Sequence, residues 1–191
     1  MKVVIVGGVA GGATAAARIR RLDERAEIVV FERSGFISYA NCGLPYYIGG
    51  VIEDPEELTL QTPESFYARF RVDVRVRHEV TAIHPGRKCV SVRSLDTGEE
   101  FEERYDKLLL SPGAHPTQPR LPGAGMEQIF TLRTVEDTFR IQSYLHSARP
   151  KSVVMAGGGF IGLELAENLR ERGMEVTIVQ RPPQLMSPFD G

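Results

Sequence analysis

Cys42 is the residue whose type and surroundings most clearly suggest chemistry, and it lies in the run Ser38-Tyr39-Ala40-Asn41-Cys42-Gly43-Leu44-Pro45. A cysteine reacts as its thiolate, and a position at the N-terminus of a helix favours that form. Pro45 suits the first turn of a helix, so we expect a helix to begin just after Cys42. Ser38 and Asn41 could form hydrogen bonds with the sulfur or with a substrate. The alternative is that Cys42 is a buried, unreactive side chain that packs as a small apolar group.

The second cysteine, Cys89, lies between Lys88 and Val90 in an alternating run, which predicts a residue packed in a strand. The two cysteines are far apart in sequence and show neither a Cys-x-x-Cys nor a Cys/His spacing. The sequence therefore predicts no disulfide framework and no metal site. A reducing, cytoplasmic location fits this cysteine usage.

A glycine pattern near the C-terminal end suggests a dinucleotide site. Gly157, Gly159 and Gly162 match G-x-G-x-x-G, with Phe160 and Ile161 between the last two glycines. The first glycine allows a tight turn, the second lets the backbone approach a pyrophosphate, and the third lets helix and strand pack closely. The following helix N-terminus supplies unpaired N–H groups and a positive dipole end.

A related pattern near the N-terminus departs from that fingerprint. The run is Gly7-Gly8-Val9-Ala10-Gly11-Gly12, in which Val9 stands at the position of the second glycine. Glu32 follows 20 residues after Gly12, where an acid would accept hydrogen bonds from a ribose, and Arg33 comes next. The alternative is a glycine-rich structural turn followed by a surface glutamate.

Each glycine pattern lies between two short apolar runs. Val3–Val6 and Ile28–Phe31 flank the first pattern, and Val153–Ala156 and Val176–Val179 flank the second. The first two runs are typical of parallel strands buried on both faces, and the second two repeat the strand pattern. An apolar stripe after the second pattern predicts an amphipathic helix that ends near Gly173. The sequence thus predicts two βαβ units.

The region between the two units is mixed. We expect a helix near Pro63–Phe70. The alternating runs Val72–Val76 and Cys89–Val92, with a turn at Thr97-Gly98, predict an antiparallel meander or hairpin. Residues 111–150 carry five prolines, which predicts a loop-rich connection.

Composition excludes several classes of protein. The 191 residues include 23 Lys and Arg against 25 Asp and Glu, a formal net charge of −2, and 42% are hydrophobic, as in an ordinary globular protein. Charges of both signs are interspersed, so we expect neither nucleic acid nor a membrane as a partner. Residues 2–17 have the outline of a secretory signal peptide, but the glycines among residues 7–12 favour a strand, a tight turn and a helix start.

Four motifs together carry a family resemblance. They are VVIVGGVAGGATAAARIRRLDE, SYANCGLPYYIGG, YDKLLLSPGA and GGGFIGLELAENL, in this order along the chain. The sequence resembles the FAD-dependent pyridine nucleotide-disulfide oxidoreductases, most closely the coenzyme A-disulfide reductase branch. That branch includes NADH oxidases and NAD(P)H-dependent persulfide or polysulfide reductases, some of which carry a rhodanese domain.

The resemblance implies an α/β fold with two Rossmann-like parts. Residues 1–149 would form an FAD-binding domain with an antiparallel β-meander, in which residues 111–149 are a connecting segment. Residues 150–191 would begin an NAD(P)-binding domain. Its two predicted strands are too few for a stable parallel sheet. Family members continue through further domains, so the resemblance implies a part of a longer enzyme, expected to be a homodimer.

The resemblance also assigns roles to residues. The first glycine run (Gly7, Val9, Ala10, Gly11, Gly12), Glu32, Arg33 and the later turn Ser111-Pro112-Gly113 would bind FAD. Gly157, Gly159, Phe160, Ile161 and Gly162 would bind NAD(P)H. Cys42 would be a single redox cysteine, because Ile37 stands where dithiol members have a second one. Arg21 matches a position near the phosphates of coenzyme A, although an exposed surface arginine is an equal alternative.

The residues that follow the last predicted strand bear on coenzyme choice. Gln180 occupies the position equivalent to Glu32, and Arg181 follows it. An acid there would bind the ribose 2′-hydroxyl and repel a 2′-phosphate, so its absence beside an arginine permits NADPH. A glutamine can also serve NADH, and both coenzymes stay open.

The implied activity is that of a flavin-dependent NAD(P)H disulfide reductase acting on coenzyme A disulfide or persulfide. Electrons would pass from NAD(P)H through the flavin to a mixed disulfide between Cys42 and a small thiol. One alternative is an NADH oxidase or peroxidase in which Cys42 cycles through a sulfenic acid. The other is a non-catalytic nucleotide-binding fragment of such an enzyme.

Overall fold

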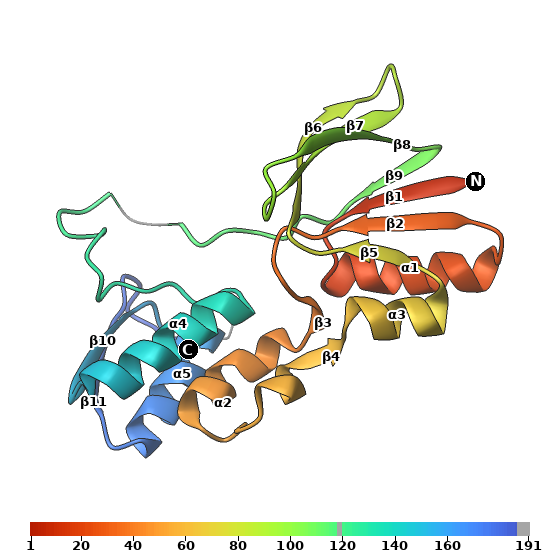
Figure 1. The fold of residues 1–191 in the computed structure, drawn as a ribbon. Coiled ribbons are helices and arrows are strands. Elements are labelled where there is room, and N and C mark those ends of the chain that lie inside the picture. The colour runs from red at the N-terminus through yellow and green to blue at the C-terminus, as the bar shows by residue number, and fades with distance from the viewer. Residues whose placement is uncertain (118–119, 187–191) are drawn as a thin grey trace. The chain divides into compact units, whose positions relative to one another are not determined.

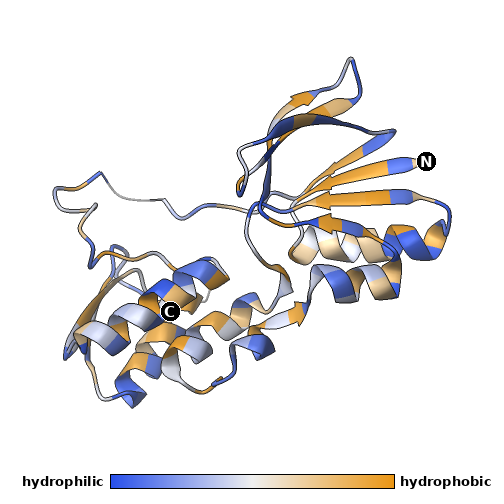
Figure 2. Cartoon of the chain, in the orientation of Figure 1, coloured by the Kyte–Doolittle hydropathy of each residue, from blue (hydrophilic) through white to orange (hydrophobic). Residues whose placement is uncertain are grey.

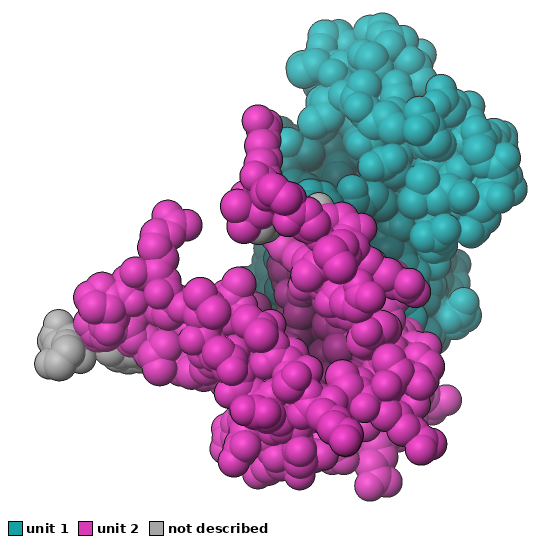
Figure 3. Space-filling model, turned by 90° about the vertical axis from the view of Figure 1, so that its left-hand side faces the viewer, with its two compact units in different colours: residues 1–39, 59–115 teal, residues 40–58, 116–191 magenta. Residues whose placement is uncertain are grey.

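The structure of the chain is a computed structural model that describes residues 1–117 and 120–186. It forms two compact units (Figure 3). Unit 1 contains Met1–Tyr39 and Thr59–His115, and unit 2 contains Ala40–Leu58 and Pro116–Gly191. The predicted boundary between residues 149 and 150 separates the part expected to bind FAD from the part expected to bind NAD(P)H. The two compact units do not test that boundary, which stays a prediction. Pro119 and the last five residues of the predicted second domain lie outside the described residues.

A parallel sheet forms the centre of unit 1. Its strand order is β5 (Asp73–Arg75), β2 (Glu27–Phe31), β1 (Lys2–Val6) and β9 (Lys107–Leu110), with every pairing parallel. The strands are mostly hydrophobic (Figure 2), and Val4 is fully buried at 0% exposure. The first predicted βαβ unit is confirmed.

Unit 1 has three layers, which follow from side-chain alternation in the strands. Helices α1 (Ala10–Leu22) and α3 (Pro63–Phe70) lie on one face of the sheet (Figure 1). Val3 packs in one cluster with side chains of both helices, whereas the next residue, Val4, packs with Val90 on the other face. Consecutive strand residues therefore anchor different layers, and α3 matches the predicted helix.

The third layer of unit 1 is the antiparallel meander. It consists of β6 (His78–His84), β7 (Cys89–Ser94) and β8 (Glu100–Arg104), paired in that order. The turn that joins the last two strands contains Gly98 at φ +76°, which confirms the predicted meander and its turn. The run Val72–Val76 was expected to lead into the meander, and this was wrong. Its strand β5 pairs with β2 in parallel, because alternation identifies a strand but not its partner.

A short hairpin-like pair completes unit 1. Strands β3 (Ile37–Tyr39) and β4 (Thr59–Gln61) pair antiparallel. The backbone N–H of Ser38 donates to the Gly8 carbonyl at 3.1 Å. This bond ties β3 to the first glycine turn.

Unit 2 contains the segment with Cys42 and the second βαβ unit. Its elements are the 3-10 helices η1 (Asn41–Gly43) and η2 (Pro55–Leu58), the helices α2 (Leu44–Gly49), α4 (Val135–Ala148) and α5 (Phe160–Glu171), and the parallel strands β10 (Ser152–Ala156) and β11 (Glu175–Val179). Ile48 of α2, Ile141 of α4 and Leu169 of α5 share one buried cluster. The three helices therefore pack around a common core, and the second predicted βαβ unit is confirmed.

Helix α4 corrects the prediction of a loop-rich connection over residues 111–150. The prolines that motivated it stand before residue 123 or at Pro150, so none interrupts the helix. Thr134 caps α4: its Oγ1 accepts from the Asp137 N–H, and the Asp137 side chain accepts from the Thr134 N–H. This capping box satisfies two N–H groups at the helix start.

Candidate functional site

The first glycine turn joins β1 to α1 with the geometry expected for a dinucleotide site. Gly7 has φ +95°, which favours glycine, and its N–H donates to the Phe31 carbonyl at 2.8 Å. A side chain at Gly12 would overlap the Gly7 carbonyl oxygen. The helix therefore approaches the strand as closely as a dinucleotide turn requires.

Glu32 lies at the end of β2 and contacts this turn directly. Its side chain is 8% exposed. Oε2 accepts from the Gly8 N–H at 2.7 Å, and Oε1 accepts from the Ser34 N–H at 2.8 Å. Each carboxylate oxygen has a second lone pair that a ribose hydroxyl could use. The structure thus brings Glu32 to the turn, and the alternative of a surface glutamate is wrong.

The turn after β9, which begins at Ser111, lies beside the first glycine turn. The Ser111 N–H donates to the Val6 carbonyl at 2.8 Å. A side chain at Gly11 would overlap Ser111 Oγ, so this hydroxyl lies against the first turn of α1. Pro112 and Gly113 follow it, with Gly113 at φ +73°.

The first candidate nucleotide site therefore lies at the carboxyl ends of three neighbouring strands. The chain crosses from β1 to β2 on one side, while β9 lies on the other, so β1 marks a switch point in strand order. Ligands of open α/β sheets bind outside the carboxyl ends of the strands at such points. The residues of this site fit the ADP half of FAD.

Of the other residues predicted to bind FAD, Val9, Ala10 and Gly11 lie at the start of α1, whereas Arg33 does not. Val9 is the N-cap residue of α1, and Ala10 and Gly11 open the helix with exposed side-chain positions. Arg33 points elsewhere: it is exposed, its Nη2 lies 2.9 Å from His115 Nε2, and its Nη1 lies 3.7 Å from Glu79 Oε1. Its predicted part in FAD binding stays a prediction.

The second glycine turn repeats the geometry of the first. Gly157 has φ +107° and donates its N–H to the Val179 carbonyl at 2.9 Å. A side chain at Gly162 would overlap the Gly157 carbonyl oxygen. The turn therefore has the same close packing of helix on strand.

Gly159 has a different reason to be glycine. It is the N-cap residue of α5 at φ −83°, and a Cβ added there would meet no atom of the described residues within 4 Å. The fold therefore does not require glycine at this position, whereas the approach of a pyrophosphate does. Phe160 and Ile161, the next two residues, are 53% and 51% exposed. Open space in front of a helix N-terminus suits the pyrophosphate of NAD(P)H.

Gln180 takes the position in unit 2 that Glu32 takes in unit 1. Its Oε1 accepts from the Gly158 N–H at 2.9 Å, and its Nε2 donates to the Gln184 carbonyl at 3.3 Å. The next residue, Arg181, is exposed. Over the described residues 180–186, this end of β11 therefore carries no acid and one solvent-facing arginine.

Cys42 lies in η1 and is exposed. Helix α2 begins two residues later, with Pro45 in its first turn, as predicted. The alternative of a buried Cys42 is therefore wrong, and its reactivity stays a prediction. Cys89, by contrast, is 2% exposed in β7, which confirms its role in packing.

The two polar neighbours predicted for Cys42 are placed differently. Asn41 belongs to η1 together with Cys42, and its Oδ1 accepts from Arg133 Nη1 at 2.9 Å. Ser38 belongs to the other compact unit, where it has φ +46°. Its part in the chemistry of Cys42 stays a prediction.

Comparison with known proteins decides the family. The sequence model of the pyridine nucleotide-disulphide oxidoreductase family matches residues 1–191. The chain belongs to this family.

Individual members of the family are similar over almost the whole chain. Coenzyme A disulfide reductase of Staphylococcus aureus is 44% identical over 189 residues, which are 99% of this chain and 42% of that protein. The crystal structure of reduced Bacillus anthracis CoADR-RHD is 51% identical with a TM-score of 0.96, over 99% of this chain and 34% of that one. An NAD-dependent persulfide reductase from A. fulgidus is 36% identical with a TM-score of 0.88, over 93% of this chain and 34% of that one. The chain spans about 42% of the length of the curated relative.

Within this pyridine nucleotide-disulphide oxidoreductase chain, Arg21 contrasts with its neighbour Arg20. Arg20 donates to the carbonyls of Phe70 and Arg71 at 2.7 and 2.8 Å and so joins α1 to the end of α3. Arg21 is exposed and forms no hydrogen bond or ion pair with the residues that the structure describes. Both of its predicted roles, phosphate contact and solvated surface residue, remain compatible with this position.

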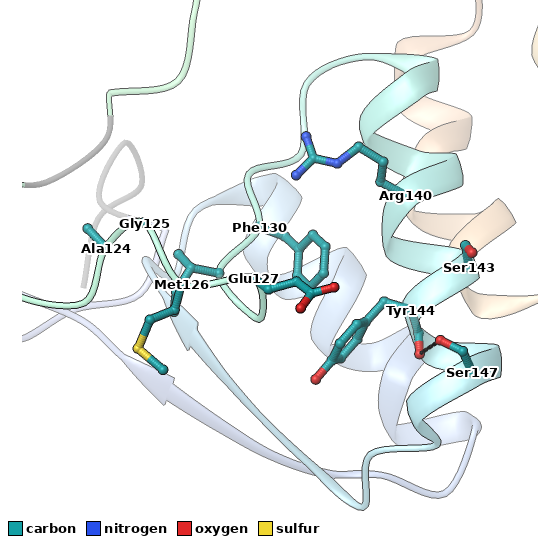
Figure 4. A pocket seen from close by; sticks show the side chains of 10 residues that line it. Ala124, Gly125, Met126, Glu127, Phe130, Arg140, Ser143, Tyr144 and Ser147 are labelled. Atoms are coloured by element: carbon teal, nitrogen blue, oxygen red, sulfur yellow. Dashed lines mark hydrogen bonds between the residues drawn. The ribbon is translucent and has the colours of Figure 1, made fainter.

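A separate pocket of about 460 Å³ lies between residues 124–130 and α4 (Figure 4). Phe130 and Tyr144 line it with their rings 5.1 Å apart, and Arg140 lies 5.9 Å from the Phe130 ring. The lining includes neither Cys42 nor any residue of the glycine turns. It is therefore not the predicted site.

Two further features concern the described ranges 1–117 and 120–186. Their helices include none with the length and apolar character needed to cross a bilayer. Within the same ranges, His, Cys, Asp and Glu side chains form no group of three that could hold a metal ion.

Sequence patterns missed Arg133, the residue that contacts Asn41. It lies 92 residues away from Asn41 along the chain, just before α4. A contact across that separation leaves no local pattern. The sequence signal that could have placed this arginine is the capping box at Thr134, which marks where α4 begins.

Proposed function

We propose that this chain is part of an FAD-dependent NAD(P)H:disulfide oxidoreductase that reduces coenzyme A disulfide or persulfide through a single redox cysteine, Cys42. The exposed position of Cys42, two residues before a helix with Pro45 in its first turn, carries the proposal. Two glycine turns with dinucleotide geometry accompany it in the same chain. The similarity to coenzyme A disulfide reductase over 99% of the chain supports the choice of substrate.

The residues that would hold FAD are those of the first site. The N–H groups at the start of α1 would face the pyrophosphate, Glu32 would accept from the ribose, and Ser111 would contact the cofactor from the end of β9. FAD, when bound, supplies the electron pair from NAD(P)H that converts a disulfide on the enzyme into two thiols.

The residues of the second turn would hold NAD(P)H in the same way. Gly159 leaves room for the pyrophosphate in front of α5. Gln180 keeps the hydrogen bond to the Gly158 N–H without placing a negative charge near the ribose, and Arg181 can pair with a 2′-phosphate. These features favour NADPH, while NADH still fits the glutamine.

Cys42 would perform the covalent step. Its thiolate attacks one sulfur of coenzyme A disulfide, the S–S bond of the substrate breaks, and a mixed disulfide between Cys42 and coenzyme A forms. The other half of the substrate leaves as a thiolate and takes up a proton from water. Reduction of the mixed disulfide by two electrons then releases the second coenzyme A and restores the Cys42 thiolate.

The experiment that tests this function is a steady-state assay of the flavin-loaded enzyme with NADPH or NADH. We expect two free thiols for each NAD(P)H oxidised in the presence of coenzyme A disulfide, and loss of this activity in Cys42→Ser but not in Cys89→Ser. Consumption of oxygen or peroxide without thiol release would replace the proposal with an oxidase or peroxidase. Absence of both activities would leave a nucleotide-binding protein.

A further inference from the structure

The hydrogen bond between Arg133 and Asn41 carries an inference about the site of Cys42. Arg133 Nη1 donates to Asn41 Oδ1 at 2.9 Å, and both side chains are half-buried. Asn41 directly precedes Cys42 in η1. Both residues belong to unit 2, so the contact lies within one compact body.

This contact fixes which end of the Asn41 amide faces Arg133. A guanidinium can only donate, so the amide oxygen must point toward it and Nδ2 must point the other way. Among the described residues, no hydrogen bond uses Asn41 Nδ2. The contact therefore leaves two N–H donors of Asn41 available next to the reactive residue.

Arg133 is itself held by the start of α4. Its backbone N–H donates to Asp137 Oδ2 at 3.1 Å, and the same carboxylate oxygen accepts from the Thr134 N–H. The buried Thr138 adds a hydrogen bond from its hydroxyl to the Thr134 carbonyl at 3.0 Å. A capped helix end is a rigid support for a side chain that must orient another.

Helix α4 also packs against α2, the helix that follows Cys42. The rings of Tyr47 in α2 and Phe139 in α4 meet edge to face with centroids 5.7 Å apart. Ile48 and Ile141 share one core cluster. The support of Arg133 and the segment that carries Cys42 are therefore parts of one packed core.

We propose that Arg133 is a positioning residue, which orients the Asn41 amide so that Nδ2 donates to the sulfur that leaves when Cys42 attacks a disulfide. The inference rests on the proposed function and extends it. In thiol-disulfide exchange, negative charge moves from the attacking sulfur to the leaving sulfur. A preorganised donor aimed at the developing charge speeds such a step. The ligand class is a disulfide whose leaving group is a small thiolate, with coenzyme A disulfide as the probe.

The test measures exchange at Cys42 without turnover. Oxidised, flavin-loaded enzyme with a reduced Cys42 is mixed with coenzyme A disulfide, and mass spectrometry follows formation of the mixed disulfide over time. Alkylation of Cys42 by iodoacetamide, which releases no thiolate, is measured in parallel. The ratio of the two rate constants separates stabilisation of a leaving thiolate from a change in Cys42 accessibility.

We expect Arg133→Met and Asn41→Ala each to slow exchange by about tenfold or more, the usual effect of losing a hydrogen bond to a charged group, while alkylation changes little. Arg133→Lys, which keeps the charge and one donor, should give an intermediate rate. Arg170→Met is the control, because Arg170 lies in the same compact unit, is exposed, and forms no side-chain hydrogen bond or ion pair with the described residues. Its exchange rate should equal that of the unsubstituted enzyme.

A double variant tests whether Arg133 acts through Asn41. In the Asn41→Ala background, Arg133→Met should cause no further loss. Full additivity of the two effects, equal loss of exchange and alkylation, or an unchanged rate in Arg133→Met would each overturn the inference. Should Arg133→Met fail to fold, an Arg133→Lys rate equal to that of the unsubstituted enzyme would overturn it.

The same data separate this inference from the proposed function. If the unsubstituted enzyme forms no mixed disulfide with coenzyme A, the proposed function fails and the inference fails with it. If the unsubstituted enzyme reacts and Arg133→Met reacts equally fast, the function stands and the inference alone is wrong.

Discussion

The backbone N–H of Gly158 donates to Gln180 Oε1 at 2.9 Å. In unit 1 the corresponding N–H of Gly8 donates to Glu32 Oε2 at 2.7 Å. In both units a glycine of the turn therefore donates to the side chain that follows the next strand. The acceptor is a neutral amide in Gln180 and a carboxylate in Glu32. The two turns therefore share this bond and differ in the charge of the side chain that accepts it.

Gln180→Glu tests the consequence for coenzyme choice. The glutamate keeps the acceptor for the Gly158 N–H and adds a negative charge that repels a 2′-phosphate. We expect kcat/KM for NADPH to fall about tenfold or more relative to that for NADH. Thermal stability should fall slightly, because the glutamate cannot donate to the Gln184 carbonyl as Gln180 Nε2 does. Gln142→Glu on α4 is the control for added charge. An unchanged NADPH to NADH ratio would show that this side chain does not select the coenzyme.

Glu32→Gln tests the first nucleotide site. The two oxygens of Glu32 accept from two backbone N–H groups, and an amide can replace only one of these acceptors. We expect weaker FAD binding, measured by absorbance titration, and a loss of about 1–3 kcal/mol in the free energy of unfolding. Glu24→Gln, in the exposed turn before β2, should change neither. FAD affinity equal to that of the unsubstituted protein would contradict the assignment.

Gly159→Val separates ligand approach from folding. A Cβ at this position meets no atom of the described residues within 4 Å, and Val9 stands at the equivalent position of the first turn. We therefore expect only a small fall in melting temperature, because valine is a weaker N-cap residue than glycine, together with NAD(P)H affinity lowered at least about tenfold, because the side chain occupies the space for the pyrophosphate. Gly162→Ala, by contrast, should lower the melting temperature, since its Cβ overlaps a backbone carbonyl. Full NAD(P)H affinity in Gly159→Val would place the coenzyme elsewhere.

Gly49→Ala tests the packing of α2 against α5. A Cβ added at Gly49 would lie 2.6 Å from Asn168 Cβ and Cγ, and Asn168 is 2% exposed, so it cannot move aside. We expect a loss of about 1–3 kcal/mol in the free energy of unfolding, measured with urea. Gly125→Ala in the same unit, where no atom lies within 4 Å of the added Cβ, is the control. Equal stability of the two variants would show that the close approach is not needed.

Much of the fold could be predicted because its signals are local. Short apolar runs gave β1, β2, β10 and β11 to within one residue, and Pro63–Phe70 is a helix with the predicted bounds. The glycine turns were also local, since φ and close packing depend on residues five positions apart. Glu32 and Gln180 could be assigned from their distance to the glycines along the chain.

The parts that were missed depend on partners far away in sequence. Alternation in Val72–Val76 indicated a strand but could not show that β5 joins a parallel sheet rather than the meander. The five prolines in residues 111–150 led to the prediction of a loop-rich connection where α4 lies. The capping box formed by Thr134 and Asp137 was the local signal for the start of this helix. The contact of Arg133 with Asn41 arises from packing of α4 on α2, which no local pattern encodes.

The most direct test of the central claim is intact-mass spectrometry of the purified enzyme after exposure to coenzyme A disulfide. We predict one adduct of coenzyme A mass, located on Cys42 by peptide mapping, lost on mild reduction and absent in Cys42→Ser. An unmodified or oxygenated Cys42 under these conditions would contradict the claim that this cysteine exchanges with coenzyme A disulfide.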